Sequence, residues 1–463
     1  MRSKHVLIAS LAVILITQCS KPAPKSTSCA QCSPIILYGC DGMEWSILLP
    51  LIQQGRMPVM ASLMQRGSYG YLETIEPTFS PVIWTTMATG KMPKDHGIEG
   101  FVYRVGPGED GQRFYTSGHR ATKAFWNILS DYSRTVDCLG WWMTYPAEHI
   151  NGVMVAQTNT TAVLHDSENA LLKGTVLRGV EDQVYPPEKQ DEVMDVLDNI
   201  DHSIDSVLTN MFGTIPHATA DITKVAWDQS QWAFRADELY LEVAKKLITS
   251  QPHFDLLAVY IGGTDVAAHR FWRYTYPQEF EHPPVASEIA SFGKILPDYY
   301  AYVDRKLGEL IAAAPKNATV IVVSDHGHHA VNIEHDFQVT DEAEMRLSGN
   351  HMDAPPGVFI AAGPNIVHTA GATISMPDRD HPIGRAWDIL PTLLALEGIP
   401  LGEDFAGKPM TNIIDPEFLK KVPVRTVKTH DDKTWDAARA ARMKEASDRA
   451  ERLEQLRSLG YIK

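Results

Sequence analysis

The sequence predicts an α/β fold: a doubly wound, mostly parallel sheet flanked by helices, with an inserted cap-like region. Apolar runs of strand length recur along the chain, and most of them end in Gly, Ser or Asp. Stretches with helical spacing of apolar residues lie between these runs. Strands that alternate with helices are typical of a parallel sheet covered on both faces. Polar residues follow several of the runs, at the strand ends where such sheets bind ligands.

The predicted strands are almost wholly apolar, which indicates burial on both faces. They cover residues 34–39, 134–142, 152–157, 255–263, 319–324 and 357–363. Helical spacing predicts helices over residues 57–67, 300–314 and 387–399. A charged segment from about residue 433 also has a helical pattern. We expect that segment to pack on the domain or to face solvent.

Length and composition limit the classes of protein that fit. With 463 residues, of which 44% are apolar, the chain can form one large α/β domain with an insert, or two domains. Its formal charge of −15 argues against a nucleic-acid-binding surface, which is normally basic. A small phosphorylated partner is compatible with this charge, because metal ions can supply local positive charge.

The N-terminus has the pattern of an export signal. A basic start precedes an apolar run, residues 6–17, that is too short to span a bilayer comfortably. Cys19 follows and resembles a bacterial lipoprotein site, although Gln18 stands where such sites favour a small residue. We expect a lipoprotein-type signal peptide over residues 1–19, export to the periplasm or cell envelope, and a membrane anchor on Cys19. Ordinary secretion and an uncleaved anchor are the alternatives.

The rest of the chain divides into three predicted parts. Residues 20–33, rich in Lys, Pro, Ser and Thr, form a tether. Residues 34–430 form the main domain, in which residues 160–250 carry no motif and are a possible cap insert over the site. Residues 431–463 form a C-terminal helical tail.

If Cys19 carries a lipid, an even number of cysteines remains in an oxidising compartment. They are Cys29, Cys32, Cys40 and Cys138. Cys29 and Cys32 form a CxxC motif, but no second pair completes a zinc site, so we expect a loop disulfide or free thiols. Cys40 ends an apolar run and is expected to be buried.

Five short segments supply seven side chains that could hold two adjacent metal ions. The segments are CDGM, PTFSPVIWTTMATG, GGTDVAAH, VVSDHGH and GNHMD. Asp and His offer the hard oxygen and borderline nitrogen ligands that suit zinc, and manganese also fits such a site. The seven residues are Asp41, Ser80, Asp265, His269, Asp325, His326 and His351.

Two of these segments have a spacing with a geometric meaning. Asp265 and His269 are four residues apart, so both lie on one face if a helix begins there. Asp325 and His326 follow a strand-like run, and a turn at its end can aim both at one ion. Either pattern also occurs by chance, and an Asp at a strand end, such as Asp41, is most often a cap or turn residue. The combination therefore carries the prediction.

Ser80 precedes a stretch with a helical pattern, so we expect it near a helix N-terminus. Backbone N–H groups at such an end favour an anion, which gives a phosphate a reason to bind there. On its own, a serine followed by proline would usually be a turn or cap residue.

In this order, the segments resemble the alkaline phosphatase superfamily, specifically its type I phosphodiesterase and nucleotide pyrophosphatase branch. The resemblance covers residues 34–410 and includes TGKMPKDHGI and WWMTYPAEHINGVMV. It implies an alkaline-phosphatase-like fold and two divalent metal ions, most suitably zinc. One ion would be held by Asp265, His269 and His351, and the other by Asp41, Asp325 and His326.

The resemblance also implies that Ser80 is the nucleophile, because it lies ten residues before Gly90 of the TG pair. A cation would lower the pKa of the hydroxyl, and a second cation, about 4 Å away, would take the leaving oxygen. Ser80 would then form a phosphoryl- or nucleotidyl-serine. Ile83 stands where many nucleotide pyrophosphatases have an Asn that donates to a phosphate oxygen, and Trp84 where they have His. This departure weakens the prediction of nucleotide specificity more than that of hydrolysis.

The leading hypothesis is therefore a hydrolase of phosphodiester or pyrophosphate bonds. A phosphate monoesterase of the same superfamily, and a surface lipoprotein that binds a metal or phosphate without catalysis, are the alternatives. A sulfatase is disfavoured because Ser80 is followed by Pro81 and because position 84 is Trp instead of Arg. The substrate, the metal and the oligomeric state are left open by the sequence.

Several neighbouring residues are weaker candidates. Ion pairs or surface positions are expected for the nearby cations Lys91, Lys123, Arg270 and Arg273. Core packing is expected for Trp272 and Tyr274, and a place outside the ligand set for His328 and His329.

Overall fold

A computed structural model describes the chain from residue 29 to residue 444, with gaps. The described ranges are 29–104, 112–157, 176, 178, 180–213, 226–228, 230–251, 253–331, 347–368 and 374–444. The predicted signal peptide, Cys19 and most of the tether lie outside these ranges. Within them, no helix has the length and apolar character needed to cross a membrane.

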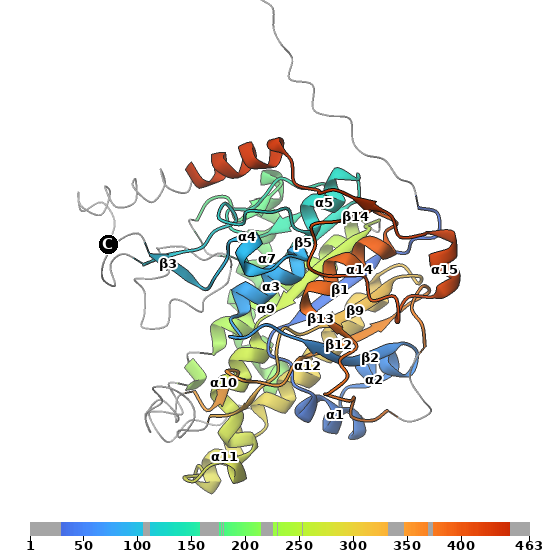
Figure 1. Cartoon of the computed structure of the whole chain (residues 1–463). Helices are drawn as coiled ribbons and strands as arrows, with labels where there is room; N and C mark the ends of the chain where they lie inside the picture. Colours follow the sequence, from blue (N-terminus) through green and yellow to red (C-terminus); the bar gives the residue numbers. More distant parts are fainter. Residues whose placement is uncertain are drawn as a thin grey trace, which may run out of the picture.

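A nine-stranded sheet forms the centre of the molecule (Figure 1). Its strand order is β13-β2-β12-β9-β1-β8-β5-β6-β7. In chain order the strands are β1 Ile35–Cys40, β2 Ser68–Glu73, β5 Val136–Leu139, β6 Met154–Val155, β7 Val184–Tyr185, β8 Leu256–Ile261, β9 Thr319–Val323, β12 Gly357–Ala362 and β13 Gly384–Arg385. All six predicted strand regions are present as β1, β5, β6, β8, β9 and β12.

The pairing is mostly parallel, which confirms the predicted fold class. β1 lies between β8 and β9 and pairs with both in parallel. β12 pairs antiparallel with β9 and with β2, and β7 pairs antiparallel with β6. Cys40 is opposite Ile261, and Gly39 is opposite Val323, so the three central strands end at the same edge of the sheet.

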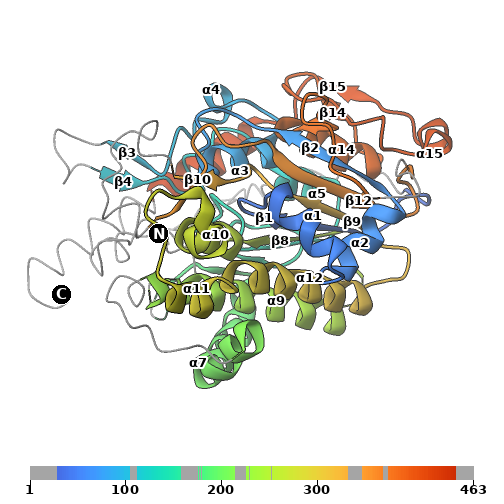
Figure 2. The ribbon, with the colours of Figure 1, turned by 90° about the horizontal axis from the view of Figure 1, so that it is seen from below.

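Helices cover both faces of the sheet. Successive residues of a buried strand point to opposite sides, so both faces carry apolar side chains that the helices bury. Ile36, Tyr38 and Cys40 of β1 belong to one apolar cluster, and Ile35 and Leu37 belong to the other. Figure 2 shows the two helix layers on either side of the strands. The first layer contains α1 Trp45–Gln53, α2 Pro58–Gln65, α7 Gln190–Phe212, α9 Gln231–Ser250, α10 Gly263–Thr275 and α12 Ile295–Ala313. The second contains α3 Ser80–Thr89, α5 Phe125–Asp131 and α14 Ile389–Leu396.

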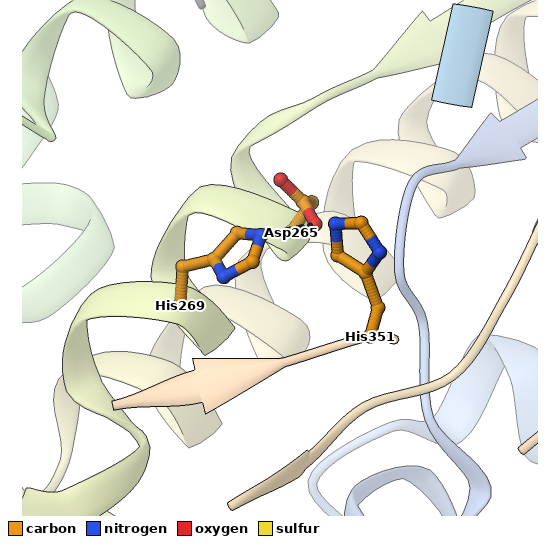
Figure 3. A group of neighbouring side chains, drawn as sticks. All are labelled: Asp265, His269 and His351. Atoms are coloured by element: carbon orange, nitrogen blue, oxygen red, sulfur yellow. Dashed lines mark ion pairs between the residues drawn. The ribbon is translucent and has the colours of Figure 1, made fainter. Parts of the chain in front are cut away.

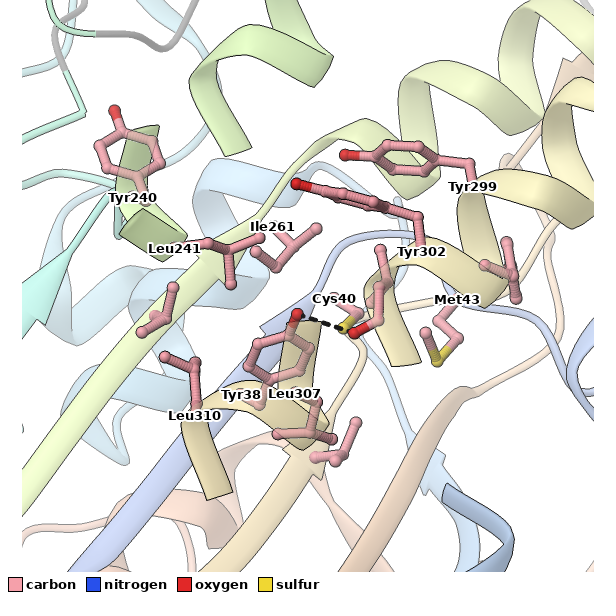
Figure 4. Close-up of a cluster of buried hydrophobic side chains, with 14 of the residues drawn as sticks. Tyr38, Cys40, Met43, Tyr240, Leu241, Ile261, Tyr299, Tyr302, Leu307 and Leu310 are labelled. Carbon is pink, nitrogen blue, oxygen red and sulfur yellow. Dashed lines mark hydrogen bonds between the residues drawn. The ribbon is translucent and has the colours of Figure 1, made fainter. Parts of the chain in front are cut away.

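The core between β1 and the first helix layer is rich in tyrosine (Figure 4). Tyr38 is fully buried, and its hydroxyl donates a hydrogen bond to the Val303 carbonyl of α12. Buried phenols need such partners, because an unpaired polar group in the core is costly. The Tyr299 and Tyr302 hydroxyls similarly donate to Asp237 and Glu238 of α9. These bonds join α9 and α12 within one layer.

The region predicted as a possible cap contributes to the main helix layer. α9 packs against β8, and α7 packs against α9. Leu239, Leu241 and Leu247 of α9 are buried in the core, which explains why this helix lies on the sheet. Residues 158–175 and 214–225 are outside the described ranges, so the cap remains a prediction there.

The C-terminal segment packs on the loop that precedes α5. Residues 433–444 form a helix, drawn red in Figure 1. Trp435 is buried, and its indole N–H donates to the Ala121 carbonyl. The described part of the predicted tail therefore contacts the domain, while residues 445–463 lie outside the described ranges.

The remaining elements are short. They are α4 Pro93–His96, α11 Ala286–Phe292, α15 Pro416–Lys421, and the strand pairs β3 Val102–Arg104 with β4 Gln112–Phe114, β10 His329–Ala330 with β11 Gly349–Asn350, and β14 Leu401–Gly402 with β15 Thr426–Val427. Near the N-terminus, Cys29 and Cys32 form a disulfide, while Cys40 and Cys138 are buried free thiols. The first result matches one of the two predicted alternatives for the CxxC pair, and Cys40 is buried as predicted.

Candidate metal centre

The structure brings all seven predicted residues together at one edge of the sheet. Asp41 follows β1 directly, and Asp325 follows β9 after Ser324. Asp265 lies in the first turn of α10, the helix that begins after β8. Because these three strands are neighbours in parallel register, their carboxyl ends place three carboxylates side by side.

The first ligand group contains Asp265, His269 and His351, which project toward one another in Figure 3. The predicted helical spacing is present, since α10 carries both Asp265 and His269, and His269 Nε2 lies 3.3 Å from Asp265 Oδ1. The Nδ1 atom of His269 is 2.6 Å from the Gly349 carbonyl oxygen. A proton on Nδ1 would therefore be held by that carbonyl, which leaves the Nε2 lone pair for a cation.

The second ligand group contains Asp41, Asp325 and His326, all of which are buried. His326 Nε2 lies 3.4 Å from Asp41 Oδ1 and 3.3 Å from Asp325 Oδ2. The other ring nitrogen of His326 is 3.0 Å from the Gly327 carbonyl oxygen, so the same tautomer is favoured here. Asp325 Oδ1 accepts a hydrogen bond from the Gly42 amide, which leaves Oδ2 for a cation.

Ser80 is the first residue of α3, at the predicted helix N-terminus, and its hydroxyl faces the second group. Its Oγ lies 3.4 Å from Asp41 Oδ1 and 3.5 Å from His326 Nε2. Ile83 is fully buried in the core of the second helix layer and offers no donor to the site.

Burial and mutual repulsion determine the protonation of these groups. Burial, together with the charge on Asp265, raises the pKa of Asp41 to about 7. Burial and the charge on Asp41 raise the pKa of Asp325 well above its usual range. Burial lowers the pKa of His326 to about 3 and that of His351 well below its usual range. The two imidazoles are therefore neutral near pH 7 and able to bind a cation.

Unpartnered buried atoms indicate that a cation belongs here. Within the described part of the metal centre, three side-chain atoms are buried without a hydrogen bond of normal geometry: Asp265 Oδ1, Asp325 Oδ2 and His328 Nε2. Such atoms are costly unless a cation or proton lies between them. The donor set of carboxylates and neutral imidazoles suits zinc or manganese. The residues present therefore fit a pair of divalent cations.

His328 lies nearer to the ligands than its expected place outside the set suggests. Its Nε2 is 3.2 Å from Asp265 Oδ1, and it forms a third possible group with Asp265 and His326. Its Nδ1 is 3.0 Å from the Gly42 carbonyl oxygen. A Cβ atom at Gly42 would lie only 2.4 Å from this ring, so the glycine of CDGM makes room for it. The spacing of His326 and His328 in the sequence could have indicated this contact.

Asp237 of α9 is a residue that the sequence did not single out. Its carboxylate accepts hydrogen bonds from the amides of Gly262 and Gly263 at the start of α10. A Cβ atom at Gly263 would lie 2.6 Å from Asp237 Oδ2, which explains a glycine there. Asp237 thus fixes the turn that precedes Asp265, and burial raises its pKa to about 7.

A pocket opens beside the ligand groups. It is lined by Asp41, Ser80, Phe101, Trp142, Gln157, Trp232, Ala233, Ala236, Asp237, Tyr260, Gly262, Asp265, Val266, His269 and His351. Four of these residues are aromatic, namely Phe101, Trp142, Trp232 and Tyr260, and the ring centroids of Phe101 and Trp142 lie 5.7 Å apart. None of the described residues that line the pocket is Lys or Arg.

The weaker candidates are engaged elsewhere. The Lys91 and Lys123 ammonium groups lie within 2.8 Å of two carboxylates each, as predicted for ion pairs; those carboxylates belong to Asp404, Asp431, Asp131 and Asp432. Arg270 and Arg273 are both buried, so the surface positions expected as one alternative for them are wrong, and Arg273 donates to the His282 carbonyl. Trp272 and Tyr274 pack in the core as predicted, and His329 contacts backbone carbonyls outside the ligand groups.

Comparisons with known proteins agree with this geometry. The sequence matches the type I phosphodiesterase/nucleotide pyrophosphatase family over residues 35–375. No curated protein matches it. The structure of wild-type alkaline phosphatase PafA is similar with a TM-score of 0.52 and 12% identity, over 84% of this chain and 100% of that chain. Murine ectonucleotide pyrophosphatase/phosphodiesterase 5 gives a TM-score of 0.43 and 12% identity, over 79% and 95% of the two chains.

The family match covers most of the chain and includes every residue of the predicted metal centre. The similarity to the PafA alkaline phosphatase shows the same fold at low identity. The chain therefore belongs to the type I phosphodiesterase/nucleotide pyrophosphatase family, a family of hydrolases.

Proposed function

We propose that the chain is an exported hydrolase of phosphodiester or pyrophosphate bonds that uses Ser80 as its nucleophile and two divalent cations. The observation that carries this proposal is the position of Ser80 Oγ. It lies at the start of a helix and within 3.5 Å of Asp41 and His326, two residues of the second ligand group. A hydroxyl at this point can bind the same cation as those two residues.

The charge of the pocket supports a diester as the substrate. A phosphate monoester is a dianion and profits from additional positive groups, whereas a diester carries a single charge. The described pocket residues include no Lys or Arg, and Asp237 adds a further acidic group. The aromatic residues that line the pocket, among them Phe101 and Trp142, can contact an apolar or aromatic substituent on the phosphate.

The residues of the chain perform separate parts of the reaction. The start of α3 can attract the phosphate through the positive end of the helix dipole, while Pro81 has no N–H and the Val82 and Ile83 amides donate to the Phe79 carbonyl. Ser80 Oγ forms a bond to phosphorus while the bond to the leaving oxygen breaks, which gives a phosphoryl- or nucleotidyl-serine. Water then hydrolyses this ester and restores the hydroxyl. When bound, the cations would lower the pKa of the Ser80 hydroxyl and offset the charge of the phosphate oxygens.

Zinc is the proposed metal, with manganese as the alternative that the same ligands accept. Asp265, His269 and His351 would hold one ion. Asp41, Asp325, His326 and Ser80 would hold the other.

The cellular location is proposed from the N-terminal sequence alone. The export signal and Cys19 indicate a lipid-anchored protein of the periplasm or cell envelope. In cell fractionation, Cys19→Ala should move the protein from the membrane fraction to the soluble fraction. Unchanged membrane association would rule out the lipid anchor.

A panel of four chromogenic esters tests the proposed activity. Zinc-loaded protein should hydrolyse bis-p-nitrophenyl phosphate well above p-nitrophenyl phosphate and p-nitrophenyl sulfate, and chelation should abolish the activity. A nucleotide p-nitrophenyl ester tests base recognition in the same assay. Dominant hydrolysis of the monoester would identify a phosphatase instead. If two metals bind and no ester is hydrolysed, the chain is a metal- or phosphate-binding lipoprotein.

A further inference from the structure

We propose that Trp84 and Tyr260 are positioning residues that occupy one carboxylate oxygen of Asp41, so that only the other oxygen can bind a cation. The inference rests on the proposed function, because it concerns the site in which Ser80 reacts. Asp41 Oδ2 accepts a hydrogen bond from the Tyr260 hydroxyl at 2.5 Å. The indole N–H of Trp84 donates to the same oxygen at 3.2 Å.

The two oxygens of Asp41 therefore have different surroundings. Oδ1 faces Ser80 Oγ and His326 Nε2, each at 3.4 Å. Oδ2 faces two donors from side chains that have no other role at the centre. A free carboxylate can bind a cation through one or both oxygens. With two hydrogen bonds on Oδ2, Asp41 presents one oxygen in a fixed orientation.

Close packing keeps the two donors in place. Trp84 is fully buried and lies edge-on against Tyr260, with ring centroids 5.2 Å apart and an interplanar angle of 88°. Trp141 packs edge-on against the same indole at 5.0 Å. A Cβ atom at Gly39 would lie 2.8 Å from the Trp84 ring, so the glycine in β1 allows the indole to rest on the strand. These contacts hold both rings next to Asp41.

The two donors lie on different elements, so each ties Asp41 to another part of the site. Trp84 lies one turn after Ser80 on α3, so its bond ties Asp41 to the helix that carries the nucleophile. Tyr260 belongs to β8, the strand that leads into α10 and Asp265. Asp41 is thereby fixed relative to Ser80 and to the first ligand group. The geometry points to a device that sets the position of the second cation beside the serine hydroxyl.

Phenylalanine substitutions test this inference, because Trp84→Phe and Tyr260→Phe remove the donors and keep an aromatic ring. Trp141→Phe is the matched control: Trp141 packs on the same indole and donates to the Trp84 carbonyl at 3.3 Å, but it makes no hydrogen bond to Asp41. Zinc is titrated into the metal-free full chain, and the affinity of each equivalent is measured together with kcat and KM for bis-p-nitrophenyl phosphate. Loss of an outer hydrogen-bond partner typically weakens metal binding by about 10- to 100-fold.

We expect Trp84→Phe and Tyr260→Phe each to weaken one zinc equivalent by about tenfold or more and to lower kcat more than they raise KM. Trp141→Phe should leave both zinc affinities within about twofold of the parent. Equal effects in all three variants would overturn the inference, since general packing would then explain them. Tighter zinc binding in the donor variants would also overturn it, because the donors would then compete with the cation.

Two further readouts keep the test interpretable. Circular dichroism and thermal unfolding of the metal-free variants report whether they fold, and Tyr260→Phe carries the test if Trp84→Phe does not. Zinc affinity does not depend on which ester is hydrolysed. A parent protein inactive on every ester would remove the proposed function while leaving the zinc comparison intact.

Discussion

Buried charges are handled in opposite ways in two regions of the molecule. One region is the metal centre, and the other is the arginine cluster, which comprises Arg120, Asn127 and Glu148. Arg120 is fully buried, and its guanidinium donates to both oxygens of Glu148, to Asn127 and to two backbone carbonyls. In the metal centre, the carboxylates of Asp41 and Asp325 lie beside the neutral imidazole of His326, and three buried atoms have no hydrogen bond of normal geometry.

The pKa values show the same contrast. Burial alone would raise the pKa of Glu148, but the charges of Arg120 and Arg442 lower it below its usual value. In the metal centre, burial and neighbouring negative charge raise the pKa of Asp41 and Asp325 instead. A buried charge that has its countercharge within the chain supports the structure. Buried charges that lack one indicate that the countercharge arrives with a bound cation.

The largest expected effect comes from a substitution that removes the attacking oxygen and leaves the charged ligands unchanged. Ser80→Ala should reduce diester hydrolysis at least about a thousandfold, because the variant lacks the attacking oxygen. Metal analysis should still find two ions per chain. Thr85→Ala, which removes a buried hydroxyl bonded only within α3, is the control and should retain most of the activity. Full activity of Ser80→Ala would exclude Ser80 as the nucleophile.

A change in the arginine cluster should lower the stability of the protein and leave metal binding unchanged. Glu148→Gln leaves the Arg120 guanidinium buried without its countercharge, and breaking a buried ion pair in this way costs about 3–5 kcal/mol. Urea denaturation of the metal-free protein measures this loss. The number of metal ions bound by the folded variant should stay at two. A variant as stable as the parent would show that the pair is dispensable.

Removal of a single ligand sharpens the distinction between the two ion sites. His269→Ala should lose one metal equivalent, because it removes an imidazole from the first group only. The second equivalent should bind as in the parent, which metal analysis after equilibrium dialysis can establish. An unchanged count of two would remove His269 from the ligand set.

Metal binding should depend on pH, since two of the acidic ligands, Asp41 and Asp325, hold protons unusually tightly. The pKa of Asp41 is raised to about 7, so below that pH a cation must displace its proton. Affinity should therefore rise with pH up to at least about pH 7, by about tenfold per pH unit for each displaced proton. His326, with its pKa lowered to about 3, adds no competing proton in this range. Affinity that is independent of pH below 7 would contradict this electrostatic description.

The smallest expected effect concerns charges that water already screens. Lys420 and Glu417 form an exposed ion pair one turn apart on α15. Lys420→Ala should change the free energy of unfolding by less than about 0.5 kcal/mol. The same urea titration used for Glu148→Gln provides the measurement. A loss as large as that of Glu148→Gln would contradict the difference expected between exposed and buried ion pairs.

Much of the fold and of the ligand set could be predicted, because the signals are local. A run such as VVSDHGH contains both the strand and the residues at its end, and Asp265 and His269 share one helix turn. The parallel order of β8, β1 and β9 then brings these ends together. Strand-end positions therefore predicted that Asp41, Asp265 and Asp325 lie near one another, while their grouping as ligands came from the family resemblance.

The residues that orient the ligands could not be predicted, because their contacts depend on packing between distant elements. Tyr260 was expected only as part of an apolar strand, and Trp84 only as a departure from a family pattern. Their bonds to Asp41 span 219 and 43 residues. Asp237 reaches α10 from a region without a motif. Such contacts become visible once the helix layers are in place.

The most direct test of the two-cation centre is a metal titration of the metal-free full chain, with bis-p-nitrophenyl phosphate hydrolysis followed at each step. We expect no hydrolysis without metal, and activity that reaches its maximum at two equivalents of zinc per chain. Hydrolysis by the metal-free protein, or saturation at a single equivalent, would contradict a two-cation centre.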